Sequence, residues 1–250
     1  DPTVALNVSI IERTPAFIGS VNIVGKDYTY DRVIRERVTV LPGDVYSQDR
    51  IIQSIRAIDG LGFFEPANEP PDIQVDPETG EVDVTFKVQE RQTGSINFGT
   101  SIGGGVGLSG FIGYEQPNLF GQAKSGSVRW DFGRFLNSFT LGFTDPALFQ
   151  TRTSGTVQLF NTIDRFFQFS SGRRRRIGGS LRFGFPVPGA LRTRVFTGYS
   201  ISRTRLDLFE NAQDNSLFGR PDGTLSQFQL GIQRTTLNSV LFPVSGSNLS

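Results

Sequence analysis

The chain has 250 residues, enough for one large or two ordinary domains. Its 25 basic and 24 acidic residues give a net charge of +1, which signals neither a nucleic-acid partner nor a polyanionic function. Cysteine, methionine and histidine are absent, which excludes thiolate and imidazole ligands, disulfides and histidine-based acid–base catalysis from this chain. With 29 glycines, 23 phenylalanines and only 37% hydrophobic residues, the composition is unusual for a water-soluble α/β enzyme, so we predict no enzymatic activity, no cofactor and no metal site.

The start of the chain indicates a piece of something longer. It begins at Asp1 without an initiator methionine or a signal peptide, as a mature or excised segment would. "NVSIIERTP" and "TFKVQERQTG" each run an alternating strand into Glu-Arg, at Glu12 and Glu90, which indicates a repeated module. Residues 1–16 are therefore predicted to be the closing strand of a preceding module.

Residues 17–92 predict a small α+β module in the order strand, helix, helix, strand, strand. Alternation in "FIGSVNIVG" gives the first strand, and helical spacing after Thr29, a candidate N-cap, gives the first helix. The second helix is predicted to begin after Ser47 as N-cap and to stop at Gly60. Two strands around a turn at 77–80 complete the module.

From Gly94 onward the sequence alternates as strands of about 9–11 residues, the length that crosses a bilayer at a tilt. A soluble sandwich or lipocalin-like barrel also alternates, but here the polar face is small, uncharged or amide-rich and the apolar face is aromatic throughout. Short connections such as "QPNLFGQ" and "PVPGAL" alternate with long ones at 164–174 and 207–223. The pattern therefore predicts an antiparallel transmembrane β-barrel over residues 93–250, apparently truncated at eight to nine strands, with Trp130 facing lipid.

The combined pattern resembles a polypeptide-transport-associated (POTRA) domain leading into an outer-membrane assembly barrel of the BamA family. The resemblance rests on "PGD" at 42–44, "LGFFE" at 61–65, Glu-Arg and Gly at 90–94, "NLFG" at 118–121, "DP" at 145–146 and "FPVSGSNLS" at the end, and it covers nearly the whole chain. Two departures are Lys26, where the family usually has asparagine, and "TLNSVLFP", which lacks the usual aspartates. The family barrel has sixteen strands, of which the sequence predicts eight and the start of a ninth.

The resemblance implies assembly and insertion of β-barrel proteins into the outer membrane of a diderm bacterium, with the POTRA module in the periplasm. The implied partners are unfolded outer-membrane protein clients, outer-membrane lipids and lipopolysaccharide, and accessory lipoproteins, with no nucleic acid. The alternative is a protein translocation or secretion channel, either a two-partner secretion transporter or a TamA-like protein. A barrel enzyme such as a lipase or protease is disfavoured by the absence of histidine.

The first barrel strand is the predicted functional site, because a weakly paired strand can open a lateral gate and offer its edge to an incoming strand. Glycine within a strand weakens packing and costs entropy, and further glycines follow at 104 and 105. An equally simple interpretation is that the glycines relieve crowding in a barrel lumen. The exposed sheet edge of the POTRA module is a second predicted client-binding site. The predicted lateral-gate residues are Gly94, Ser95, Ile96, Asn97, Phe98, Gly99, Thr100, Ser101, Ile102 and Gly103.

A run of four arginines follows the predicted strand near 157–163. If Gly94 starts a strand rising from the periplasm, 164–174 is an external loop, so the run predicts contact with lipopolysaccharide phosphates rather than nucleic acid. The alternative is a solvated loop whose alternate arginines enter the lumen. Because arginine on the lipid face at mid-depth costs about 2–4 kcal/mol, the run is expected at the rim. The residues are Arg173, Arg174, Arg175 and Arg176.

Overall fold

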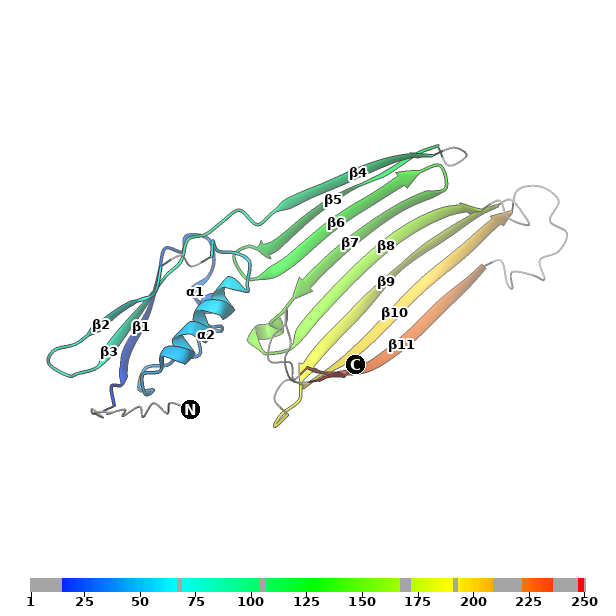
Figure 1. Cartoon of the computed structure of the whole chain (residues 1–250). Helices are drawn as coiled ribbons and strands as arrows, with labels where there is room; N and C mark the ends of the chain where they lie inside the picture. The colour runs from blue at the N-terminus through cyan, green and yellow to red at the C-terminus, as the bar shows by residue number, and fades with distance from the viewer. Residues whose placement is uncertain are drawn as a thin grey trace, which may run out of the picture. The chain divides into compact units, whose positions relative to one another are not determined.

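The computed structural model describes residues 15–66, 69–103, 107–166, 172–190, 193–208, 222–235 and 247–249, and the chain divides into two compact units between Gln92 and Thr93 (Figure 1). Almost all of the predicted upstream strand at 1–16 lies outside the described residues. Each unit is described by itself.

The N-terminal unit contains β1 (Ile18–Val24), α1 (Asp31–Arg35), α2 (Gln48–Asp59), β2 (Asp72–Val75) and β3 (Val82–Lys87), which confirms the predicted order. Its sheet has β3 in the centre, parallel to β1 and antiparallel to β2. Alternate residues of β3, namely Val82, Val84 and Phe86, are buried in the core with Ile51 and Ile58 of α2. The two periodicities read from the sequence therefore meet in one apolar layer.

The two helix starts differ in how well the sequence predicted them. Ser47 is the N-cap of α2, and its hydroxyl accepts a hydrogen bond from the Arg50 amide at 3.5 Å, as predicted. The prediction of Thr29 as N-cap was wrong, because α1 begins at Asp31 after Tyr30, which makes no side-chain cap. Thr29 is buried instead, and its amide donates a hydrogen bond to the carboxylate of Glu90, a residue near the C-terminal end of the module. Glu90 therefore holds the segment before α1 and does not cap the helix, which begins at Asp31.

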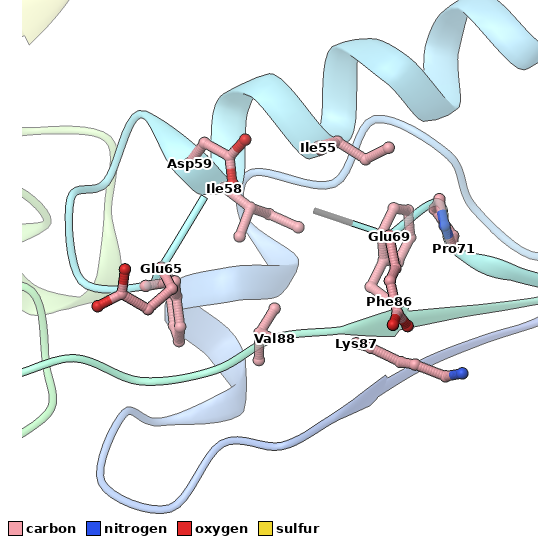
Figure 2. Close-up of a pocket in the computed structure, with 10 residues that line it drawn as sticks. Ile55, Ile58, Asp59, Glu65, Glu69, Pro71, Phe86, Lys87 and Val88 are labelled. Atoms are coloured by element: carbon pink, nitrogen blue, oxygen red, sulfur yellow. The ribbon is translucent and has the colours of Figure 1, made fainter. Parts of the chain in front are cut away.

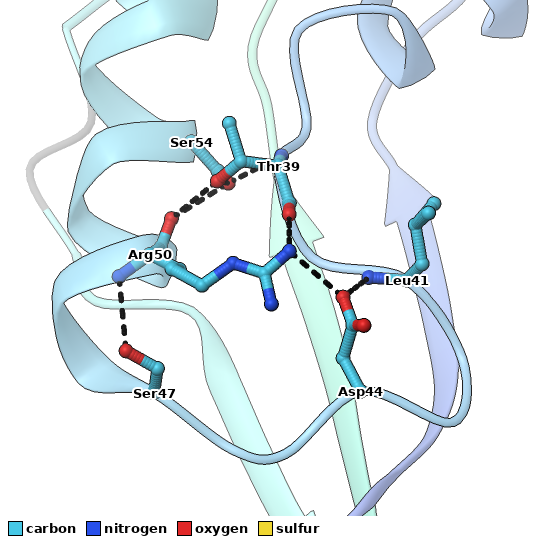
Figure 3. A network of polar contacts seen from close by, with 6 residues as sticks. All are labelled: Thr39, Leu41, Asp44, Ser47, Arg50 and Ser54. Atoms are coloured by element: carbon cyan, nitrogen blue, oxygen red, sulfur yellow. Dashed lines mark hydrogen bonds and ion pairs between the residues drawn. The ribbon is translucent and has the colours of Figure 1, made fainter.

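A polar network fastens the segment between the two helices onto α2 (Figure 3). The hydroxyl of Ser54, which is fully buried, accepts from the Thr39 amide at 2.9 Å and donates to the Arg50 carbonyl at 2.8 Å. The Arg50 guanidinium donates to the Thr39 carbonyl and pairs with Asp44 at 2.8 Å. Asp44 also accepts from the Leu41 amide at 3.0 Å, so one chain of contacts orders the whole connection.

Replacing Ser54 by alanine should destabilise this unit by about 1–3 kcal/mol, because the part-buried Thr39 amide loses its acceptor. Gln53→Ala, at an exposed position of the same helix, is the matched control and should change little. Hydrogen–deuterium exchange of peptides spanning 39–59 in the full-length protein measures the difference. Equal protection in Ser54→Ala and Gln53→Ala would show that the network does not hold the connection.

The C-terminal unit is one antiparallel sheet whose strands follow chain order (Figure 1). Its elements are β4 (Ser95–Gly103), β5 (Gly107–Leu119), β6 (Lys124–Gly133), β7 (Leu136–Asp145), the short 3-10 helix η1 (Leu148–Gln150), β8 (Ser154–Phe166), β9 (Gly172–Pro186), β10 (Thr193–Leu208), β11 (Asp222–Thr235) and β12 (Asn248–Leu249). Eight full strands and the start of a ninth confirm the predicted fold class. Among the described residues β4 and β12 stand at opposite edges and are not paired with each other.

Several strands are longer than predicted. The expected 9–11 residues hold for β4, β6 and β7, but β5 and β8–β11 have 13–16 residues. The extra length lies partly in segments predicted as loops, since β8 continues to Phe166 and β9 begins at Gly172. Polar residues can extend a ladder beyond the apolar segment because only the hydrocarbon-facing part must be apolar.

The sheet has one apolar and one polar face. Cross-strand partners such as Phe98 and Ile112, or Trp130 and Phe139, share the apolar face, and these side chains remain exposed. Trp130 lies there and donates its indole N–H to Asn137 at 3.2 Å. Monomers surrounded by water rarely expose so extended an apolar surface, so its continuation over eight strands indicates lipid contact. Other apolar-face residues are Ile96, Ile102, Leu108, Tyr114, Val128, Leu141, Phe143, Val157, Leu159, Ile177, Leu181, Phe183, Phe185, Tyr199, Ile201, Phe228, Leu230 and Ile232.

No helix in the described part of the chain has the length and hydropathy needed to cross a bilayer.

Candidate functional site

The first strand of the large sheet is an edge strand. β4 pairs with β5 through nine residue pairs, from Ser95 opposite Glu115 to Gly103 opposite Gly107. Among the described residues nothing pairs with its other side. Of the ten predicted gate residues, nine form β4 and Gly94 directly precedes it, whereas glycines 104 and 105 lie outside the described residues. Another strand added beside β4, from the rest of the barrel or from a client, would use the backbone N–H and C=O groups on this side.

Glycine occupies part of the ladder between β4 and β5. Cross-strand side-chain contacts supply much of the stability of a sheet, and glycine cannot make them. Four of the nine pairs contain glycine, and these pairs are Asn97 with Gly113, Gly99 with Phe111, Thr100 with Gly110, and Gly103 with Gly107. These four pairs depend on backbone hydrogen bonds, whereas Ile96 with Tyr114, Phe98 with Ile112, and Ile102 with Leu108 also bring apolar side chains together.

Crowding also explains two of these glycines. On the polar face, a Cβ at Gly99 would lie 2.7 Å from the Phe111 ring, over which the Arg129 guanidinium stacks at 4.2 Å. On the apolar face, a Cβ at Gly110 would lie 2.6 Å from the carbonyl oxygen of Gly99 and 2.8 Å from the Phe132 ring. At Gly113 the nearest atoms would be 3.8 Å away. The close approach of β4 and β5 therefore requires glycine at 99 and 110 but not at 113.

The Glu-Arg pair that precedes β4 anchors the end of the N-terminal unit. The Glu90 carboxylate accepts from the Tyr28 amide at 2.8 Å and the Thr29 amide at 2.6 Å. Arg91 donates its Nε–H to the Gly62 carbonyl at 3.0 Å and its amide to the Phe63 carbonyl at 3.0 Å. The sequence marked these residues only as a recurring motif. The structure shows that they tie the last segment of the module to two of its loops.

The environment of Glu90 lowers its pKa. Partial burial raises the pKa of Glu90, but hydrogen bonds from the Thr29 and Tyr28 amides to the charged form outweigh burial, so the net pKa lies below the ordinary value of 4.5. A lowered folded-state pKa means that ionised Glu90 stabilises the module above about pH 4.5, and that this stability is lost as the pH falls through the folded-state pKa.

Replacing Glu90 by alanine should destabilise the module at neutral pH by about 1–3 kcal/mol, because the Thr29 amide loses its acceptor. Glu90→Gln keeps one carbonyl acceptor and should lose less. Hydrogen exchange over 25–30 in the full-length protein, with each variant compared to the wild type at pH 7 and again at pH 3.5, is the measurement. The difference between wild type and Glu90→Gln should shrink in acid, and a difference that grows would contradict the assigned role.

The N-terminal sheet has one open edge. The amide of Asp76 donates to the Glu81 carbonyl, so Asp76 and Glu81 form a hydrogen-bonded pair of the antiparallel ladder. Because hydrogen-bonded and non-hydrogen-bonded pairs alternate along such a ladder, the N–H and C=O groups of Ile73 and Val75 point away from β3. The side chains of both residues are exposed. Among the described residues nothing pairs with this side of β2. Sequence reasoning had left open which edge is free, and the structure indicates β2.

The opposite edge of this sheet is covered. At the start of β1, Ile18 donates its amide to the Asp44 carbonyl at 2.8 Å and accepts from the Gly43 amide at 2.7 Å. Further along, the Val21 carbonyl accepts from the Arg35 guanidinium at 3.1 Å. These contacts occupy backbone groups that an added strand would need.

A hollow lies between α2 and the end of β3 (Figure 2). Ile55, Ile58 and Phe86 form its apolar wall, and Asp59, Glu65, Glu69 and Lys87 provide charged groups. Pro71, which precedes β2, is also part of the lining, so the hollow adjoins the open edge. Its free volume of about 20 Å³ holds about one water molecule and not a side chain.

The arginine run lies in a strand. Arg173–Arg176 are part of β9, so their placement in an external loop was wrong. Strand pairing is favoured here because Arg174 pairs with Asp164 of β8 at 2.5 Å and Arg173 with Asp207 of β10 at 2.8 Å. By alternation, Arg173 and Arg175 share the apolar face, whereas Arg174 and Arg176 share the polar face.

Two other sequence motifs hold turns. In "NLFG", the buried Asn118 side chain accepts from the Ala123 amide at 2.8 Å, and Phe120 and Gly121 have positive φ of 57° and 69°. In "DP", Asp145 accepts from the Ala147 amide at 2.9 Å and pairs with Lys124 at 3.4 Å. These residues join the ends of β5, β6 and β7 and have a structural role.

Comparison with known families assigns both units. Residues 16–91 match POTRA, described as a surface antigen variable number repeat, and residues 118–250, more than half of the chain, match the Omp85 superfamily domain. The chain belongs to the Omp85 superfamily. It carries the POTRA-plus-barrel organisation of a BamA-like protein, which places this Omp85 chain in the outer membrane with its POTRA module in the periplasm.

Relatives of this Omp85 chain include outer membrane protein assembly factor BamA of Buchnera aphidicola, 26% identical over 250 residues that cover 96% of this chain and 39% of that protein. BamA of Neisseria meningitidis is 24% identical, covering 92% of this chain and 30% of that protein. Sorting and assembly machinery component 50 homolog B of Xenopus laevis is 28% identical over 71% of this chain and 39% of its own length. The chain thus spans well under half of each relative.

Two solved structures share the fold. BamA from Haemophilus ducreyi lacking POTRA domains 1–3 aligns with a TM-score of 0.68 and 23% identity, covering 93% of this chain and 47% of that one. CdiB from Acinetobacter baumannii aligns with a TM-score of 0.51 and 16% identity, covering 88% of this chain and 43% of that one. At these identities the likeness concerns the Omp85 fold alone.

Proposed function

We propose that the protein containing this chain assembles β-barrel proteins and inserts them into the outer membrane. The single observation that carries the proposal is β4, the first strand of the sheet, whose ladder with β5 contains glycine in four of its nine residue pairs. A client strand pairs with the open side of β4 through backbone hydrogen bonds and so enters the membrane without exposing its own polar groups to lipid. No catalytic step is part of this mechanism.

The POTRA module contributes a second strand-binding edge. An unfolded client binds in extended form along β2, through the backbone groups of Ile73 and Val75 that point away from β3. Backbone hydrogen bonding at this edge is independent of the client's sequence, which suits a protein that handles many clients. Accessory lipoproteins would dock elsewhere on the periplasmic modules.

The competing function is export of one substrate through the barrel, for which the likeness to CdiB is the specific observation. The two functions differ in the final location of the client, which is the membrane for assembly and the far side of the membrane for export. Full-length protein in liposomes is mixed with an unfolded barrel client or with a soluble secretion substrate. Assembly predicts faster appearance of folded, membrane-inserted client, and transport of soluble substrate into the liposome without faster barrel insertion would favour export.

A further inference from the structure

The apolar face of the large sheet changes character abruptly toward one end of β9 and β10. On β10 the apolar-face series runs Tyr199, Ile201 and then Arg203 and Arg205. On β9 it runs Leu181, Gly179, Ile177 and then Arg175. Register places Arg203 opposite Ile177 and Arg205 opposite Arg175, so β9 changes from isoleucine to arginine one same-face position further along the sheet than β10.

Three arginines at this boundary surround one depression. Arg175, Arg203 and Arg205 line a hollow whose remaining wall is Ile177, and this set is called the arginine hollow below. All three arginines are exposed. The sequence run had drawn attention to 173–176 alone, although the spacing "RTR" at 203–205 on an alternating strand was the available signal for the other two.

The positive charge of the arginine hollow is not neutralised within the described residues. Arg175 makes one hydrogen bond, to the Asn161 side chain at 3.4 Å, and no described carboxylate forms an ion pair with Arg175, Arg203 or Arg205. Asp222 stands opposite Arg205, but its carboxylate accepts from the Leu206 amide at 3.3 Å, and Asp207 on the same face pairs with Arg173. The guanidinium groups therefore remain available to an anion.

The rest of the arginine run is engaged elsewhere. Arg173 pairs with Asp207 at 2.8 Å. On the polar face, Arg174 pairs with Asp164 and Arg176 lies over the Phe160 ring at 5.5 Å. Of the four arginines singled out in the sequence, only Arg175 thus belongs to the arginine hollow.

Strand direction places the arginine hollow at the external side. β4 begins directly after the periplasmic module, so β4, β6, β8 and β10 run outward and β5, β7, β9 and β11 run back. The end of β10 and the start of β9 are therefore external. Arginine on a lipid-exposed face costs about 2–4 kcal/mol at mid-depth and about 0–1 kcal/mol near the interface, so the switch from isoleucine to arginine marks the level of the outer-leaflet headgroups.

We propose that the arginine hollow binds a phosphate group of lipopolysaccharide in the outer leaflet. Guanidinium forks pair with phosphate oxygens in a bidentate manner, while the neighbouring isoleucines contact the acyl chains of the same lipid. This assignment rests on the outer-membrane topology and not on the assembly mechanism. Of the four predicted arginines it keeps Arg175 alone, and it adds Arg203 and Arg205 as phosphate-contacting residues.

The test compares two double variants of the full-length protein in phosphatidylcholine nanodiscs containing a minor fraction of diphosphoryl lipid A. Arg203→Gln/Arg205→Gln should lower the affinity for lipid A about tenfold or more, since each lost charge-assisted hydrogen bond is strong. Arg174→Gln/Arg176→Gln removes the same charge from the polar face and should bind as the wild type does. Equal losses in the two variants would overturn the assignment.

A second lipid and a second pair of substitutions complete the test. Phosphatidylglycerol in place of lipid A distinguishes a lipopolysaccharide site from a general anionic-lipid site, and equal Arg203/Arg205-dependent binding of both lipids would overturn the choice of ligand. Should the glutamine variant fail to fold, Arg203→Lys/Arg205→Lys keeps the charge but loses the bidentate fork, and wild-type affinity in that variant would also contradict the proposal. Client insertion in liposomes without lipopolysaccharide should be unchanged by these variants, which separates this site from the assembly function.

Discussion

Replacing Gly110 by alanine should reduce client insertion by the full-length protein about tenfold or more, whereas Gly113→Ala should leave it near wild type. The two glycines lie in the same strand and oppose the same edge strand, β4. A Cβ at Gly110 would come 2.6 Å from the Gly99 carbonyl oxygen, a backbone atom that cannot move without displacing β4, whereas a Cβ at Gly113 would meet nothing nearer than 3.8 Å. Overpacking of this kind costs about 1–3 kcal/mol, and 1.4 kcal/mol corresponds to a factor of ten.

The measurement is the rate at which each variant inserts a client into liposomes. This rate is divided by the folded fraction of the variant, which is determined from its heat-dependent mobility in gel electrophoresis. A displaced β4 no longer presents its edge in register, so the insertion rate falls although the rest of the barrel is formed. Equal insertion rates for the two variants would mean that the alignment of β4 on β5 does not matter for assembly.

Replacing Val75 by proline should weaken binding of unfolded clients to the POTRA module about tenfold, because it removes an N–H group that points to the open side of β2. The exposed Val75 side chain itself contributes little to the core, and the bonds between β2 and β3 do not use this amide. Val75→Ala is the matched control, since it shortens the side chain and keeps the N–H group.

Binding is measured by crosslinking an extended client peptide to the full-length protein, and folding of the module by hydrogen exchange over 82–87. Loss of crosslinking in Val75→Pro with retained protection of β3 supports client pairing at this edge. Similar crosslinking in the proline and alanine variants would place client binding elsewhere on the module.

Local sequence patterns predicted the elements well where the cause is local. Ser47 caps its own helix, and the alternation of Val82, Val84 and Phe86 reports a buried strand, so both were readable from the sequence. Thr29 was misjudged because its partner, Glu90, is 61 residues away. A contact over that sequence distance is invisible to any local rule.

The predictions of functional sites likewise succeeded where the cause is local and failed where it depends on distant residues. The edge position and glycine content of β4 follow from the sequence, because the first strand of a sheet built in chain order has to lie at an edge. The steric need for glycine at 99 and 110 depends on where Phe111 and Phe132 pack, and the open edge of the module depends on the fold-back of residues 43–46 over β1. The arginines were assigned to a loop because charge favours loops on average, whereas here Asp164 and Asp207 on neighbouring strands extend the ladder.

The most direct test of the account places photo-crosslinkers at Phe98, Thr100 and Ile102 of β4 in the full-length protein and follows an unfolded barrel client during membrane insertion. The account predicts crosslinks from β4 to a terminal strand of the client, and loss of these crosslinks when a disulfide locks β4 to the last barrel strand. Crosslinks only to the protein's own last strand, with client insertion unaffected by the lock, would contradict assembly at the β4 edge.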